Sequence, residues 1–132
     1  MIFVDTSFWV GLAMPRDRRH VAARALFERW DGERLLTTTL VRGETWTLLG
    51  RRAGHRAALA FSDRLDASAR LRTDHVDRDL DREAWAWLRR HDERSYSYVD
   101  ATSFAVMRSL RVREALAFDG DFAAAGFVEL QP

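Results

Sequence analysis

Two aspartates directly follow short apolar runs that are typical of buried strands. Asp5 comes after Met1–Val4, and Asp119 comes after Ala115–Phe118. In open α/β sheets, ligands bind beyond the carboxyl ends of the strands, which is where an acid that follows a strand must lie. Asp119 also belongs to the sequence Asp119-Gly120-Asp121, which is common in turns. A turn role therefore remains open for Asp119 and Asp121. Both strand-end carboxylates are candidates for chemistry at one edge of a sheet.

Two further acids fall on the apolar sides of expected helices. Glu44 lies in the apolar arc of a helix over Leu40–Arg52, where a carboxylate is costly unless it is paired or bound to a metal. An ion pair with an inward arginine of that helix is the alternative. Asp100 faces the core side of a helix over Tyr98–Arg111. An acid in a first helical turn commonly stabilises the helix N-terminus, but Ser97 can supply that cap and leave Asp100 free for chemistry.

These four acids would converge on one end of a parallel sheet. Converging carboxylates repel one another, and their pKa values rise if the charges are not neutralised. A hard divalent cation resolves this repulsion, and oxygen ligands without His or Cys select Mg²⁺ or Mn²⁺ over zinc. Metal sites of this kind perform phosphoryl chemistry, because the metal polarises a phosphate and activates water for in-line attack. The residue types therefore point to metal-assisted hydrolysis of a phosphate ester.

The elements that must position these acids alternate between strands and helices, which is typical of a parallel sheet covered on both faces. The expected strands are Met1–Val4, Arg34–Thr38, Leu71–Val76, Glu114–Phe118 and Phe127–Leu130. The other expected helices are Ser7–Met14, His20–Trp30, His55–Ala67, Asp77–Asp92 and Phe122–Ala125. Because no repeat, linker or low-complexity segment interrupts them, we expect residues 1–132 to form a single domain. Its fold class would be α/β, a three-layer α/β/α sandwich around a parallel sheet of four to five strands.

The spacing of apolar residues also predicts which helix positions are buried. In the His55–Ala67 helix, the residues expected to be buried are Ala58, Leu59, Phe61 and Leu65. In the Asp77–Asp92 helix, Trp85 and Leu88 are expected to face the core. The acids at the start of that helix are spread around its axis among arginines, so we expect a solvated face there and not a metal cluster.

The composition excludes several function classes. No cysteine is present, which rules out thiolate nucleophiles and Cys-based zinc or iron–sulfur sites and fits a reducing compartment. All 21 basic residues are arginine, and the absence of lysine excludes a P-loop NTPase and any Schiff-base mechanism. No apolar run approaches the length of a membrane span, and Asp5 interrupts the N-terminal one. We therefore expect a soluble cytoplasmic protein without a signal peptide.

Several blocks of this sequence occur together in one known family. They are Ile2–Ser7, the helix that carries Glu44, Tyr98–Met107, Ala117–Phe122 and the pair Gly126-Phe127. With these blocks in order along the whole chain, the sequence resembles the PIN-domain family, specifically the VapC-type toxin ribonucleases of toxin–antitoxin systems. The resemblance implies a metal-dependent ribonuclease that hydrolyses RNA phosphodiester bonds and is usually a homodimer. It also implies inhibition by a small VapB-type antitoxin, whose tail enters the acidic groove, often with an arginine.

The resemblance further implies roles for individual residues. It assigns an acidic quartet of catalytic metal ligands, namely Asp5, Glu44, Asp100 and Asp119. Within it, Asp5 and Asp100 would be the most direct ligands of Mg²⁺ or Mn²⁺. Asp121 is an auxiliary ligand candidate, and Thr6 or Ser7 would steady the water network. The chain matches the family pattern at all four quartet positions, whereas its middle region carries no motif that identifies the RNA substrate.

Arginines at the groove rim are candidates for holding the RNA backbone, although each is equally well explained as a surface residue that confers solubility. They are Arg16, Arg18, Arg19, Arg42, Arg51 and Arg52.

The alternative function is a non-catalytic PIN-like module that binds RNA or protein, and four converging acids argue against it. A haloacid-dehalogenase-type phosphatase needs an aspartate at the position of Ser7 and a lysine, and a receiver domain also needs a lysine, so neither fits.

Overall fold

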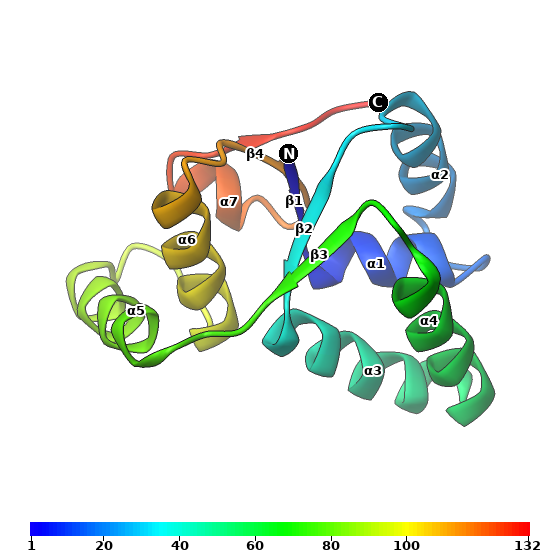
Figure 1. Cartoon of the computed structure of the whole chain (residues 1–132), viewed down its shortest axis with the longest axis horizontal. Helices are drawn as coiled ribbons and strands as arrows, with labels where there is room; N and C mark the ends of the chain where they lie inside the picture. The colour runs from blue at the N-terminus through cyan, green and yellow to red at the C-terminus, as the bar shows by residue number, and fades with distance from the viewer.

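Five short strands form one parallel sheet, in the order β3-β2-β1-β4-β5, in the computed structural model, which describes residues 1–132 (Figure 1). They are β1 (Ile2–Val4), β2 (Leu35–Thr38), β3 (Leu71–Asp74), β4 (Glu114–Leu116) and β5 (Val128–Glu129). The central strand β1 pairs with both β2 and β4, and Phe3 is in register with Leu36 on one side and Ala115 on the other. Because every pairing is parallel, the residues that follow the strands gather at one edge of the sheet.

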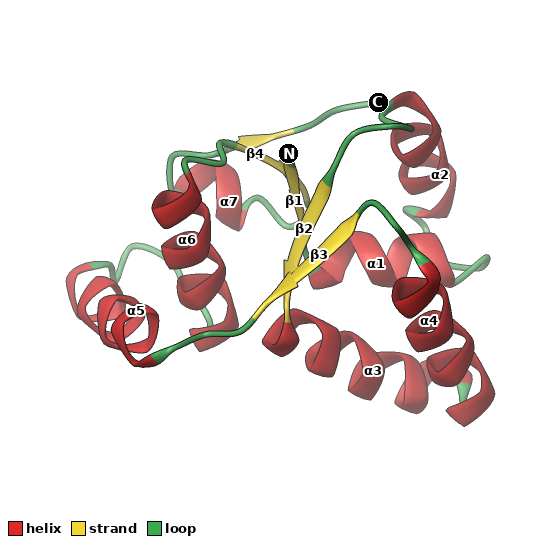
Figure 2. Cartoon of the chain, viewed as in Figure 1, coloured by secondary structure: helices red, strands yellow, loops and turns green.

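Helices cover both faces of this sheet. They are α1 (Thr6–Ala13), α2 (His20–Arg29), α3 (Thr39–Ala53), α4 (His55–Ala67), α5 (Arg78–Arg90), α6 (Tyr98–Leu110) and α7 (Asp121–Ala124). Helices α1 to α4 lie on one side of the sheet, and α5 to α7 lie on the other (Figure 2). The expected three-layer α/β/α sandwich is therefore confirmed, with five strands. No helix is both long enough and apolar enough to cross a membrane.

Short polar side chains set the points at which helices begin. Thr38 ends β2 and caps α3, since its Oγ1 accepts a hydrogen bond from the backbone N–H of Val41 at 3.1 Å. Asp5 caps α1 directly after β1, and Ser97 caps α6. These caps satisfy N–H groups that have no partner within the helix. In α1 and α6 they also lie at the edge where the strands end, so capping and site geometry involve the same residues.

Two strands end two residues earlier than the sequence predicted. β3 stops at Asp74 and β4 at Leu116. Beyond β4 the backbone N–H of Phe118 donates to Ser7 Oγ at 3.0 Å and not to a neighbouring strand. The chain thus leaves the sheet before Asp119, which lies in the loop between β4 and α7.

Two predictions of helix burial are wrong. Trp85 is 51% exposed, and Trp87 is the tryptophan of α5 that faces the core, at 6% exposed. Trp87 packs edge-to-face on Phe104 of α6, with ring centroids 5.0 Å apart. In α4, Leu59 is 45% exposed, while the other three residues expected to be buried are buried. The apolar spacing of both helices allows more than one rotation about the axis, and the rotation adopted depends on the neighbouring helix.

Candidate active site

A polar hollow of about 350 Å³ opens at the edge of the sheet where the strands end. Its lining residues come from all parts of the chain: Asp5, Thr6, Ser7, Val10, Asp17, Arg18, Arg19, Glu44, Leu48, Arg52, Asp100 and Asp119. The four acids singled out from the sequence therefore share one hollow. They come from the end of β1, from α3, from the first turn of α6 and from the loop after β4.

Asp5 is the most deeply buried acid of the hollow, at 3% exposed. Its Oδ2 accepts hydrogen bonds from the backbone N–H of Ser7 at 3.1 Å and from Ser7 Oγ at 2.8 Å. Burial is the main reason that the pKa of Asp5 rises to about 7, and the negative charge of Asp119 adds to it, whereas the Ser7 hydrogen bonds oppose it. Oδ1 of Asp5 accepts no hydrogen bond from the protein and remains available to a ligand.

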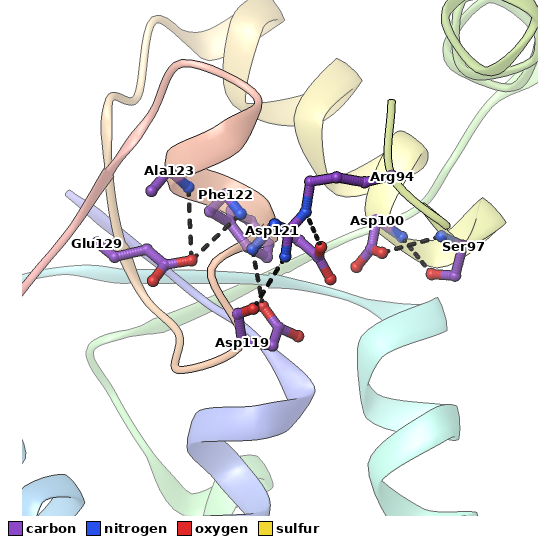
Figure 3. Close-up of polar contacts among 8 residues, drawn as sticks. All are labelled: Arg94, Ser97, Asp100, Asp119, Asp121, Phe122, Ala123 and Glu129. Atoms are coloured by element: carbon purple, nitrogen blue, oxygen red, sulfur yellow. Dashed lines mark hydrogen bonds and ion pairs between the residues drawn. The ribbon is translucent and has the colours of Figure 1, made fainter. Parts of the chain in front are cut away.

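Asp100 and Ser97 cap α6 together, as Figure 3 shows. The backbone N–H of Asp100 donates to Ser97 Oγ at 3.0 Å, and the backbone N–H of Ser97 donates to Asp100 Oδ2 at 2.9 Å. The two roles considered from the sequence are thus compatible, because the cap uses one carboxylate oxygen and leaves the other free. Burial raises the pKa of Asp100 to about 6, with the charges of Asp121 and Asp119 adding to the rise and the Ser97 backbone hydrogen bond opposing it.

Asp119 and Asp121 differ in what their carboxylates contact. Asp119 lines the hollow, and burial raises its pKa against the opposing effect of a hydrogen bond from the backbone N–H of Asp121. That hydrogen bond reaches Asp119 Oδ1 at 3.3 Å, so the turn interpretation holds in part. The Asp121 carboxylate does not line the hollow and instead accepts a hydrogen bond from Arg94 Nε at 2.9 Å (Figure 3).

Glu44 reaches the hollow from α3 without a protein partner. Its side chain is half-buried, beside the fully buried face formed by Val41, Thr45 and Leu49. It takes part in no ion pair, and Arg42 of the same helix is paired with Asp66 at 2.7 Å. The alternative of an ion pair within α3 is therefore not adopted.

Half of the arginines considered for the rim line the hollow. Arg18, Arg19 and Arg52 do, whereas Arg16 and Arg51 do not and Arg42 is held by Asp66. The sequence did not single out two other contributors. Asp17 lines the hollow and accepts a hydrogen bond from the backbone N–H of Arg19 at 2.8 Å, and Arg94 holds the loop that carries Asp119. Both lie in charged segments between helices, where residue type alone carries no signal of a role.

The donor chemistry of the hollow suits a hard divalent cation. Its acids offer oxygen ligands only, and three of them have raised pKa values, chiefly because of burial and further because of the negative charges of neighbouring acids. Thr6 Oγ1 is buried at the hollow with no hydrogen-bond partner, which marks a polar position that a water or ligand would satisfy. However, no group of three or more acids is arranged to hold a metal ion in this structure.

Comparisons with known proteins agree with this architecture. The family model of the PIN domain matches residues 2–128. The chain is 55% identical to the 23S rRNA-specific endonuclease VapC20 of two Mycobacterium tuberculosis strains, CDC 1551 / Oshkosh and H37Rv, over 100% of this chain and 99% of theirs. The crystal structure of VapC20 from that species, described as a sarcin-ricin loop cleaving toxin, superposes with a TM-score of 0.95 at 54% identity and covers 100% of both chains. FitAcB from Neisseria gonorrhoeae shares the fold, with a TM-score of 0.68, 15% identity and coverage of 100% and 98%.

Proposed function

The chain belongs to the PIN-domain family, and we propose that it is a toxin ribonuclease, an endonuclease that hydrolyses RNA phosphodiester bonds with Mg²⁺ or Mn²⁺. One observation carries the proposal: four acids from distant parts of the chain line a single hollow, and burial raises the pKa of three of them. A structural role does not require four acids around one hollow, two of them buried, because a buried charged carboxylate destabilises the fold when it lacks a partner.

The residues of the hollow have separable tasks in this proposal. Asp5, Asp100, Asp119 and Glu44 would hold the cation, which when bound polarises the scissile phosphate and offsets its charge. Ser7 orients the Asp5 carboxylate through two hydrogen bonds, and Thr6 Oγ1 is free to bond an ordered water. Arg18, Arg19 and Arg52 would bind the RNA backbone at the rim, since a hollow lined with acids needs cationic groups to attract a polyanion.

The proposed substrate is the sarcin-ricin loop of 23S rRNA. The support is the 55% identity, over the whole chain, to endonucleases specific for 23S rRNA, one of which is described as cleaving that loop. The test is to incubate the protein with 23S rRNA and with unrelated structured RNAs in Mg²⁺ or Mn²⁺, and to map the 5′ ends of the products. We expect cleavage at one position in the loop, none in EDTA, and none with the double variant Asp5→Asn/Asp100→Asn. Cleavage that persists in the double variant would contradict the proposed site.

A non-catalytic module that binds RNA or protein is the second candidate. The specific observation in its favour is that no three acids form a ready metal-binding group. Titration of the protein with Mn²⁺, followed by calorimetry, separates the two candidates. Cleavage accompanied by Mn²⁺ binding supports the nuclease, whereas the absence of both, with RNA binding retained, supports the module.

The proposed partners are a VapB-type antitoxin and a second copy of the chain. An antitoxin arginine would pair with carboxylates of the hollow. Three of these, Asp5, Glu44 and Asp100, form no ion pair within the chain. We expect the gene to neighbour a short reading frame whose product abolishes cleavage when it is co-purified.

Light scattering after gel filtration would give twice the monomer mass for a homodimer.

A further inference from the structure

Arg94 connects the two segments that carry Asp100 and Asp119. It lies in the segment between α5 and α6, just before the Ser97 cap that binds Asp100. Its Nε donates to Asp121 Oδ1 at 2.9 Å, and its Nη2 donates to the backbone carbonyl of Asp119 at 3.2 Å (Figure 3). One planar guanidinium thus bridges the first side chain of α7 and a backbone oxygen of the β4–α7 loop.

Both ends of this bridge are anchored to the core. On the α6 side, the ring of Tyr96 packs edge-to-face on Trp87 at 4.7 Å and on Phe104 at 5.8 Å. On the far side of the loop, Phe122 is fully buried, and Glu129 Oε1 accepts hydrogen bonds from the backbone N–H groups at the start of α7. Between these anchors, the stretch from Asp119 to Asp121 is held across to the α6 side by Arg94.

The backbone of the loop allows this close approach. Gly120 adopts φ +82°, a left-handed conformation that glycine accepts without strain. A Cβ at this position would lie 3.5 Å from Arg94 Nη2, in ordinary contact, so conformation and not space favours glycine. The turn lets the carbonyl of Asp119 point toward Arg94 while its carboxylate lines the hollow.

We infer that Arg94 is a positioning residue that fixes the Asp119 carboxylate relative to Asp100, and that Asp121 anchors Arg94 and is not a metal ligand. This inference rests on the proposed nuclease function. Arg94 itself does not line the hollow, so it acts through the loop. Residues that orient metal-binding carboxylates in this way typically change metal affinity or activity by about 10–100-fold when they are replaced.

The decisive comparison is between Arg94→Gln and Arg108→Gln. Arg108 pairs with Glu83 at 3.2 Å and has a similarly exposed side chain, 34% against 42%, but it lies in the last turn of α6, away from the hollow. We expect Arg94→Gln to lower kcat on 23S rRNA and Mn²⁺ affinity by about 10–100-fold with little change in KM. Arg108→Gln should match the wild type in all three quantities. Because exposed ion pairs contribute little to stability, the thermal midpoints of both variants should stay close together.

Amide hydrogen exchange tests the bridge without relying on catalysis. In Arg94→Gln, the amides of residues 119–125 should exchange faster, while Arg108→Gln should leave them unchanged. If the wild type neither cleaves RNA nor binds Mn²⁺, the proposed function fails, and these exchange rates still decide whether Arg94 holds the loop. Equal exchange rates in the two variants would overturn the inference.

Further variants separate geometry from charge. Arg94→Lys keeps the charge but loses the planar fork, so we expect it to recover only a small part of the lost kcat. The double variant Arg94→Gln/Asp121→Ala should be no worse than either single variant, because both changes break the same bridge. Full recovery by Arg94→Lys would mean that the charge alone matters, and additive losses in the double variant would show that Asp121 has a separate role. Either result would overturn the inference.

Discussion

Two hollows flank α1, and they differ in what the fold buries there. The polar hollow is lined in part by Asp5, which caps α1, and by Thr6, its first residue. The second hollow, of about 510 Å³, lies between α1, α2 and α4 and is mostly lined by hydrophobic side chains, among them Trp9, Phe27 and Phe61. Neighbouring residues of one short helix thus contribute to two environments with opposite energetics.

The difference shows which side chains contribute to stability and which reduce it. Trp9 and Phe61 pack edge-to-face at 5.8 Å and are nearly buried, so their contact stabilises the fold. Asp5 is equally buried but must lose its charge or gain a counter-ion to be tolerated. Replacing residues in the two hollows should therefore change stability in opposite directions, and only the polar hollow should affect catalysis.

The largest expected effect is on catalysis in the polar hollow. Asp5→Asn should reduce the cleavage rate by roughly 1,000-fold, because several kcal/mol of charge stabilisation in the transition state are lost. Single-turnover cleavage of 23S rRNA measures this rate, and circular dichroism confirms that the variant is folded. A rate within tenfold of the wild type would remove Asp5 from the site.

The next effect is a pH-dependent loss of stability caused by Asp5. Its pKa is about 7 when folded and 3.8 in the unfolded reference, so between these values the folded state retains a proton that the unfolded state has released. Stability is therefore lost as pH rises from about 4 to about 7, by on the order of 4 kcal/mol. Urea unfolding in EDTA should show Asp5→Asn gaining stability over the wild type as pH rises. If the two proteins differed in free energy of unfolding by the same amount at every pH in this range, the burial of the Asp5 carboxylate would be contradicted.

In the apolar hollow, removing a side chain should lower the free energy of unfolding and not raise it. Phe61→Ala should destabilise the protein by about 3 kcal/mol, since it removes a ring that is 7% exposed and packed on Trp9. Its kcat should remain that of the wild type at a temperature where it is folded. Leu59→Ala is the matched control on the same helix, because Leu59 is 45% exposed and should change the free energy of unfolding by less than about 0.5 kcal/mol.

The smallest expected effect is stabilisation by the cation. At a Mn²⁺ concentration about 100 times its Kd, the wild type should gain about 2.7 kcal/mol, because only the folded state offers the assembled site. Asp5→Asn should gain much less, and Phe61→Ala should gain as much as the wild type. Differential scanning calorimetry with and without Mn²⁺ measures these shifts. Equal gains in all three proteins would show that the ion binds elsewhere.

The success of the sequence predictions depended on how local the signal was. The cap at Ser97 and the apolar spacing of the helices are local, and α3 and α6 begin and end within one residue of the expected Leu40–Arg52 and Tyr98–Arg111. The inward tryptophan of α5 was misassigned because Trp85 and Trp87 both fit an amphipathic helix, and the contact with α6 selects Trp87. The hydrogen bond from Arg94 to the backbone of Asp119 joins residues 25 positions apart, so no short sequence pattern predicts it.

The parallel α/β/α architecture and the four candidate acids could be predicted from the sequence, because apolar periodicity and strand-end carboxylates are properties of short segments. The folded chain was needed to show that these acids share one hollow, that Asp121 is bound by Arg94 and lies outside that hollow, and that Glu44 has no arginine partner. Short segments do not reveal these features, because the burial and charge interactions that raise the pKa of Asp5 and Asp100 arise between residues brought together from distant parts of the chain.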